Sequence, residues 1–123
     1  MAVPPPAERR TPTLQREVLP GAQAVEPTQL LSNGHYHVAL RANGAGSSSR
    51  GTVGITRSRD DALRDEYGSF FYLRRWGGAR MQSITQHPAP DPAAHYHSSF
   101  HADRVCFDTR WPHLQAQVTV WVS

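Results

Sequence analysis

The chain has 123 residues, 38% hydrophobic and 19% charged, which allows one small domain with a modest core and excludes a sandwich joined to a catalytic barrel. The formal net charge is +3, and all 13 basic residues other than histidine are arginines, a bias that a GC-rich genome explains better than a binding role. The single cysteine, Cys106, excludes a disulfide framework, and no apolar run is long enough for a membrane span or a signal peptide.

Residues 1–29 are predicted to form a linker or disordered segment. They have scattered charges and no hydrophobic periodicity, and they contain Pro4, Pro5, Pro6, Pro12, Pro20 and Pro27. Such a composition does not bury enough apolar surface to offset the entropy of ordering.

Residues 30–123 are predicted to form an antiparallel, all-β sandwich. Short runs rich in β-branched and aromatic residues alternate there with turn signals such as Asn33-Gly34, Asn43-Gly44 and Gly77-Gly78, and no stretch has a helical period. The predicted strands are His35–Arg41, Thr52–Arg57, Ser69–Arg75, Ala79–Thr85, His95–His101, Arg104–Asp108 and His113–Val122. The last strand runs almost to Ser123 without a turn, so we expect the chain to end inside a domain and to leave a strand edge unpaired.

No arrangement of residues in the sequence amounts to a catalytic site. The charged run 57–66 is interpreted as a solvated connection, because a glycosidase needs carboxyl groups that face each other across the substrate. The sequence also has no Gly-x-Ser-x-Gly elbow and no His-Glu-x-x-His helix, and Ser47–Ser49 is interpreted as a flexible loop. We therefore expect no catalytic residue in this chain.

The histidines raise the question of a metal site. His35 and His37 share one face of a predicted strand, and so do His95 and His97, with His101 nearby. A zinc site needs three or four converging ligands, which this spacing does not specify. We therefore predict no metal and no cofactor.

The aromatic residues are expected mostly in the core, because most of them lie in predicted strands. This applies to Phe70, Tyr72 and Phe100, whereas Trp76, next to Gly77-Gly78, is the aromatic residue most expected to be exposed.

Three segments follow one another along the chain, Leu30–Val38, Thr56–Ala62 and Tyr67–Arg74, and they are continued by His95-Tyr96, Phe100, Asp103-Arg104 and Phe107. In this order they resemble the cyclic β-1,2-glucan synthases, at the start of their C-terminal, glycoside-phosphorylase-like region of glycoside hydrolase family 94. The resemblance implies a partial β-supersandwich like that of galactose mutarotase, followed in full-length enzymes by an (α/α) barrel that holds the catalytic acid and the phosphate site.

The resemblance implies a non-catalytic, carbohydrate-binding or structural role. The expected partners are a β-glucan or oligosaccharide, the barrel of the full-length enzyme and a second copy of the chain. Arg50, Arg57, Arg59 and Asp60 are the candidate sugar contacts. We expect a cytoplasmic location for this chain, whereas full-length enzymes of the family would be associated with the inner membrane.

Two alternatives remain open. One is a basic module that binds nucleic acid, which the positive charge and the aromatic residues favour. The acidic residues Asp60, Asp61, Asp65 and Glu66 argue against it, so nucleic acid is not an expected partner. The other alternative is a module that serves only in packing and dimerisation, which would associate without affinity for sugar.

Overall fold

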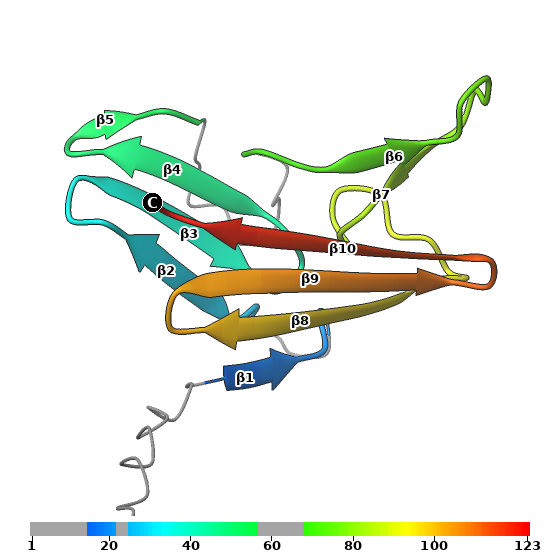
Figure 1. Ribbon diagram of the computed structural model, residues 1–123, viewed down its shortest axis with the longest axis horizontal. Helices are drawn as coiled ribbons and strands as arrows, with labels where there is room; N and C mark the ends of the chain where they lie inside the picture. The colour runs from blue at the N-terminus through cyan, green and yellow to red at the C-terminus, as the bar shows by residue number, and fades with distance from the viewer. Residues whose placement is uncertain (1–14, 22–24, 57–67) are drawn as a thin grey trace, which may run out of the picture.

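The computed structural model describes residues 15–21, 25–56 and 68–123, which form ten strands and no helix (Figure 1). The strands are β1 (Gln15–Val18), β2 (Thr28–Ser32), β3 (Tyr36–Arg41), β4 (Gly46–Arg50), β5 (Val53–Gly54), β6 (Tyr72–Arg74), β7 (Met81–Ser83), β8 (His95–His101), β9 (Arg104–Trp111) and β10 (Leu114–Trp121). All pairs of these strands are antiparallel. The prediction of an antiparallel all-β fold is confirmed.

The first four-stranded sheet, sheet A, has the strand order β1-β8-β9-β10. Strands β9 and β10 pair along their whole length, from Arg104 opposite Trp121 to Trp111 opposite Leu114. Every second side chain of β9 is buried, beginning with Val105, because successive side chains of a strand point to opposite faces. Sheet A therefore has an inner face that is largely apolar and an outer face that is largely polar.

The second four-stranded sheet, sheet B, has the order β2-β3-β4-β5. The turn between β2 and β3 is fixed by Asn33, whose Oδ1 accepts hydrogen bonds from the backbone N–H groups of His35 at 2.9 Å and Tyr36 at 2.8 Å. Gly34, which follows Asn33 in this turn, has a φ of 92°, a conformation that glycine adopts without steric cost. The sequence signal Asn33-Gly34 thus produces the expected tight turn.

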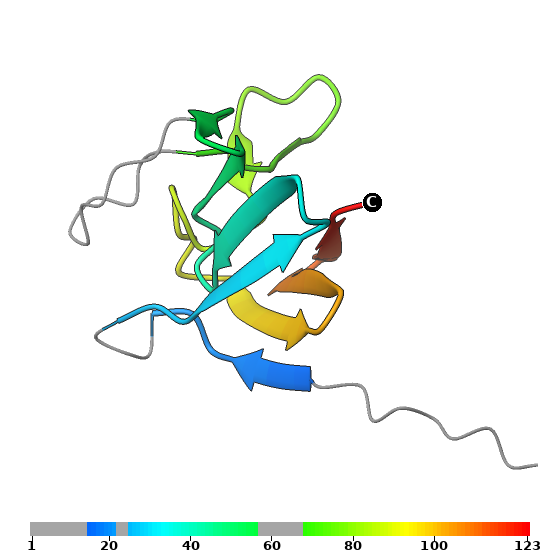
Figure 2. The same ribbon diagram turned by 90° about the vertical axis from the view of Figure 1, so that its left-hand side faces the viewer.

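The two sheets face each other, with sheet B lying over sheet A (Figure 2). Buried residues from both sheets and from the turn after β3 form one core: Val18, Leu31, Leu40, Ala42, Phe100, Val105 and Phe107. Partly buried valines pack against this core, namely Val38, Val118, Val120 and Val122. This arrangement is the predicted β-sandwich.

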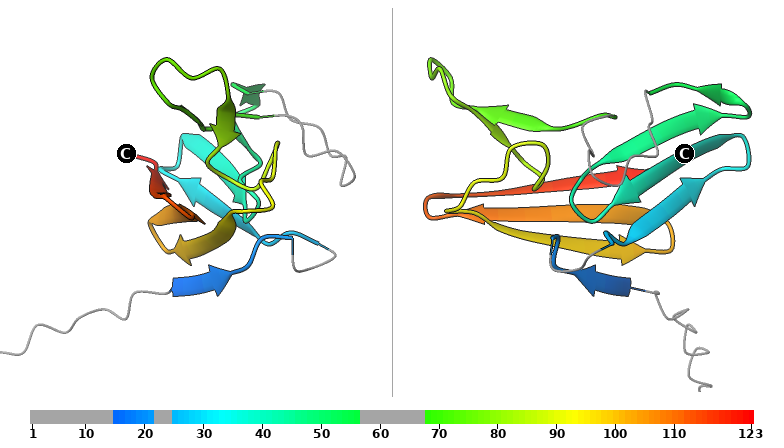
Figure 3. Two further views of the ribbon diagram at one scale, coloured as in Figure 1. Left: turned by 90° about the vertical axis from the view of Figure 1, so that its right-hand side faces the viewer. Right: turned by 180° about the vertical axis from the view of Figure 1, so that it is seen from behind.

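The strands of sheet A extend past sheet B, and the hairpin β6–β7 lies above this extension (Figures 1 and 3). The segment that follows β7 is bonded to sheet A. Thr109 Oγ1 donates a hydrogen bond to the carbonyl of Ile84, and Tyr96 Oη accepts one from the backbone N–H of Asp91 at 2.8 Å. These bonds hold the hairpin to the inner side of sheet A.

The turn between β3 and β4 is buried and tightly packed. Gly44 has a φ of 93°, and a Cβ atom at this position would lie 2.2 Å from the Cβ of Thr85. The carbonyl of Asn43 accepts a hydrogen bond from the backbone N–H of His87 at 2.8 Å, and Ser98 Oγ donates one to the carbonyl of Ala42 at 2.6 Å. This turn therefore joins sheet B, the segment after β7 and sheet A.

Two segments predicted to be irregular form strands. Within residues 1–29, Gln15–Val18 is β1 and Thr28–Gln29 begins β2, so the prediction is wrong there, whereas residues 1–14 and 22–24 lie outside the described residues. The expected loop Ser47–Ser49 lies in β4. Gly46 allows this strand to approach β3, since a Cβ there would lie 2.6 Å from the carbonyl oxygen of Ala39.

The predicted strands are recovered with different lengths. His95–His101 is confirmed at both ends, and the predicted Arg104–Asp108 continues to Trp111. Thr52–Arg57 shortens to Val53–Gly54 within the described residues. Phe100 is buried and Trp76 is 98% exposed, as predicted. The prediction that Tyr72 lies in the core is wrong, because this side chain is exposed on the two-stranded sheet.

Candidate functional site

The outer face of sheet A carries a row of polar side chains near the start of β8. The antiparallel register places His95 opposite Arg110 and His97 opposite Asp108, and Gln115 opposite Arg110 on the next strand. Directly opposite residues point to the same face of a sheet. Side chains from three adjacent strands therefore come together on one surface.

A pocket of about 410 Å³ lies at this surface. Its lining residues are Leu19, His95, Tyr96, His97, Asp108, Thr109, Arg110 and Gln115. Strand β1 pairs with β8 only over Ser98–His101, so β8 extends beyond the end of β1, where the exposed Leu19 follows. The pocket thus combines polar groups with one apolar side chain.

Hydrogen bonds and charge pairs orient several of these groups. Gln117 Nε2 donates to Asp108 Oδ1 at 3.0 Å, so Asp108 retains Oδ2 as an acceptor. His97 Nε2 lies 3.7 Å from Glu17 Oε2, which forms a charge pair when the imidazole is protonated. Among the described residues, no group forms a hydrogen bond or ion pair with the guanidinium of Arg110. Arg110 therefore offers several free donors to a ligand.

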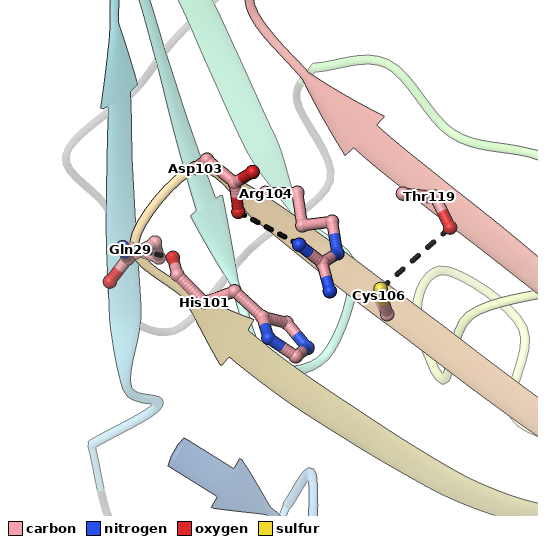
Figure 4. A network of polar contacts seen from close by, with 6 residues as sticks. All are labelled: Gln29, His101, Asp103, Arg104, Cys106 and Thr119. Carbon is pink, nitrogen blue, oxygen red and sulfur yellow. Dashed lines mark hydrogen bonds and ion pairs between the residues drawn. The ribbon is translucent and has the colours of Figure 1, made fainter. Parts of the chain in front are cut away.

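The opposite end of the same outer face has a different polar network (Figure 4). Arg104 Nη1 lies 3.0 Å from Asp103 Oδ1 in the turn between β8 and β9. Gln29 Nε2 donates to the carbonyl of His101 at 3.0 Å and so ties sheet B to this turn. These contacts lie within the fold and do not involve the residues that line the pocket.

The candidate residues from the sequence lie elsewhere or outside the described residues. Arg50 is exposed at the end of β4, opposite Tyr36, and does not line the pocket. Arg57, Arg59 and Asp60 lie in the segment 57–67, which is outside the described residues. The structure therefore does not bring Arg50 together with the pocket residues.

The histidines are only partly brought together. His95 and His97 do share one face of β8, as their spacing predicted, and both line the pocket. His35 precedes β3 in sheet B, and His37 lies in β3 itself. In the described ranges, no three His, Cys, Asp or Glu side chains converge as metal ligands would.

Sequence reasoning did not identify Asp108, Arg110 and Gln115 as site residues. Their signal is the alternation in β9, where Asp108 and Arg110 are separated by Thr109, and Phe107 and Thr109 point inward. Alternation identifies the solvent face of a strand but does not show which polar positions border a pocket.

The structure also bears on membrane association. No helix in the described residues is long and apolar enough to cross a membrane.

Comparison with known proteins agrees with the observed sandwich and with the resemblance of the sequence. The model of the glycosyl hydrolase 94 supersandwich domain matches residues 16–123. A cyclic beta-(1,2)-glucan synthase, NdvB of Rhizobium meliloti (strain 1021), is 36% identical over 80 residues, which are 65% of this chain and 3% of that protein. The chain thus spans only a small part of the length of this relative. Because the family model covers most of the chain, including nine of the ten strands completely, the chain belongs to the glycosyl hydrolase 94 supersandwich domain family.

Proposed function

We propose that this chain is a non-catalytic β-sandwich module that binds β-1,2-glucan in a cyclic β-1,2-glucan synthase or a related glycoside phosphorylase. The observation that carries the proposal is the pocket on the outer face of sheet A in a domain of this family. The similarity to a protein named as a cyclic beta-(1,2)-glucan synthase supports the glucan as ligand. The barrel of the full-length enzyme is the proposed partner of the module.

The chemistry of the pocket suits a sugar. Sugar hydroxyl groups both donate and accept hydrogen bonds, and Asp108 accepts, Arg110 donates and Gln115 does both. The exposed side chain of Leu19 offers an apolar surface to the C–H groups of a sugar ring. The volume of about 410 Å³ falls within the usual range of small-ligand pockets, roughly 300–1,000 Å³.

The pocket does not suit glycoside cleavage. Its lining includes one carboxylate, Asp108, whereas hydrolysis of a glycoside ordinarily requires two carboxyl groups on opposite sides of the bond. A binding role needs no such pair. The proposal therefore assigns binding to this chain and catalysis to the barrel.

Arg110→Ala is expected to weaken binding of β-1,2-gluco-oligosaccharides about tenfold, since losing a hydrogen bond to a charged group costs about 1.5 kcal/mol or more. Isothermal titration calorimetry measures the effect. The matched control is Arg74→Ala, which removes an exposed arginine from β6, away from the pocket. Unchanged affinity in Arg110→Ala would show that the sugar does not bind in this pocket.

Arg50→Ala distinguishes the two candidate surfaces. The proposed alternative contact surface consists of Arg50, Arg57, Arg59 and Asp60. Of these, only Arg50 lies in the described residues. A loss of affinity in Arg50→Ala but not in Arg110→Ala would favour that surface over the pocket.

The chain is expected to release no glucose 1-phosphate and no new reducing ends from β-1,2-gluco-oligosaccharides with inorganic phosphate. The reason is that the pocket supplies a single carboxylate. Turnover that persists through purification to homogeneity and disappears in Asp60→Asn or Asp61→Asn would contradict the non-catalytic proposal.

A further inference from the structure

The chain contains two asparagines, and each of them is followed by glycine. The backbone nitrogen of such a glycine attacks the side-chain amide of the asparagine before it, because glycine has no Cβ that blocks the approach. As dipeptides the two sites are therefore equally reactive. The structure separates them, since Asn33 is exposed in the turn between β2 and β3, whereas Asn43 is 2% exposed in the turn between β3 and β4.

The hydrogen bonds around Asn33 favour this attack. Its Oδ1 accepts from the backbone N–H groups of His35 and Tyr36, and the bond to His35 folds the side chain over the peptide group that it must react with. Negative charge develops on Oδ1 during the attack, and two N–H donors aimed at this oxygen stabilise that charge. The attacking nitrogen belongs to Gly34, whose N–H donates to the hydroxyl of the exposed Ser32 at 3.0 Å.

The surroundings of Asn43 oppose the same reaction. The N–H of Gly44 donates to the carbonyl of Arg41 at 2.9 Å, and Asn43 Oδ1 accepts from the backbone N–H of Ala45 at 3.0 Å. Both residues of this dipeptide are buried, and the turn lies tightly against Thr85. Ring closure needs a local rearrangement of the backbone and water for the proton transfers, and a buried, closely packed turn restricts both.

We propose that Asn33 is a site of spontaneous deamidation in the folded chain, whereas Asn43 is protected by the fold. The nitrogen of Gly34 forms a bond to Cγ of Asn33 and loses its proton to water. The bond between Cγ and Nδ2 breaks, and Nδ2 takes up a proton and leaves as ammonia. Water then opens the cyclic imide at one of its two carbonyl groups. One opening gives aspartate and the other gives isoaspartate, and both replace a neutral amide by a carboxylate.

The two products differ in their effect on the turn. Aspartate keeps an acceptor oxygen for the two backbone N–H groups, so the turn persists. Isoaspartate adds a carbon atom to the main chain directly after Ser32, which pairs with His37 at the end of the ladder between β2 and β3. Both products lose the hydrogen bond that Asn33 Nδ2 donates to the carbonyl of Ser123 at 2.8 Å. Neither turn contributes a residue to the pocket, so the proposal does not depend on sugar binding.

The test is peptide mapping by mass spectrometry after the folded full chain has been incubated in mildly alkaline buffer for increasing times. Trypsin cleaves after arginine, so the two asparagines fall in different peptides, residues 17–41 and residues 42–50. We expect the conversion of amide to acid in the peptide 17–41 to be about tenfold faster or more than in the peptide 42–50. In urea that unfolds the chain, the two rates should converge, because both sites then react as unstructured dipeptides.

Asn33→Gln is the matched control variant. It keeps a side-chain amide at this position, but the ring that it would have to form is larger and closes far more slowly, so the conversion in the peptide 17–41 should disappear. Conversion of this peptide no faster than that of 42–50 in the folded chain would overturn the proposal. Conversion that persists in Asn33→Gln would do the same, and rates that stay different in urea would show that the fold is not what protects Asn43.

Discussion

Gly44→Ala is expected to lower the free energy of unfolding by roughly 2–6 kcal/mol, which is a large part of the stability of a small domain. Two costs combine at this position. The backbone has a φ of 93°, where a residue with a Cβ is strained, and the new Cβ would lie 2.2 Å from the Cβ of the buried Thr85. Neither atom is at the end of a flexible side chain, so the turn between β3 and β4 must shift away from the segment after β7. Urea denaturation followed by tryptophan fluorescence measures the change.

Gly34→Ala is the matched control for this experiment. Gly34 has a φ of 92°, nearly that of Gly44, but a Cβ there would meet no atom within 4 Å. The control therefore carries the backbone cost alone, about 1–2 kcal/mol. Equal losses in the two variants would show that the packing against Thr85 contributes nothing, contrary to this interpretation of the turn.

Phe107→Ala is expected to cost about 3–5 kcal/mol, because it leaves a cavity in the middle of the sandwich. Phe107 is 2% exposed and belongs to the core cluster formed by both sheets. Phe71→Ala makes the same chemical change at a side chain that is 40% exposed, and it should cost less than about 1.5 kcal/mol in the same urea experiment. A cost for Phe71→Ala as large as that for Phe107→Ala would mean that the core does not lie between sheets A and B.

The parts of the fold that the sequence predicts are those governed by local patterns. His95–His101 was predicted at both ends, and the alternation from Leu114 to Val122 identifies the inner face of β10. Turn chemistry located the tight turns at Asn33-Gly34 and Asn43-Gly44. In each case the information lies within a few residues of the feature itself.

The strands that the sequence did not predict form because they pair with other strands. Three of the four residues of β1 are exposed, and Val18 alone contributes to the core. The residues of β4 have the composition of a loop, yet β3 pairs with them over five positions. Propensity is a weak guide in such segments, because packing against other strands determines whether they form.

The pocket was missed for the same reason. The spacing of His95 and His97 predicted that they share one face of a strand. The other pocket residues become neighbours only through the register of three strands, namely Asp108, Arg110 and Gln115. The pocket is also bounded by the end of β1, a strand that the sequence did not predict. A site formed by register and by one strand ending early has no signal in local sequence.

The position of β1 in sheet A has a consequence for the order of folding. Strands β8, β9 and β10 are consecutive in the chain and are joined by short turns. Strand β1 pairs with β8 although most of the chain separates them in sequence, as Gln15 opposite His101 shows. Closing a short loop costs less entropy than closing a long one, so the consecutive strands pair first and β1 docks afterwards. During synthesis β1 emerges before β8, but this partner strand is complete only when His101 has been made. Of the strands of sheet A, β1 is then the first to be made and the last to pair, and its exposed residues, which include Arg16 and Glu17, give it a polar surface until it pairs.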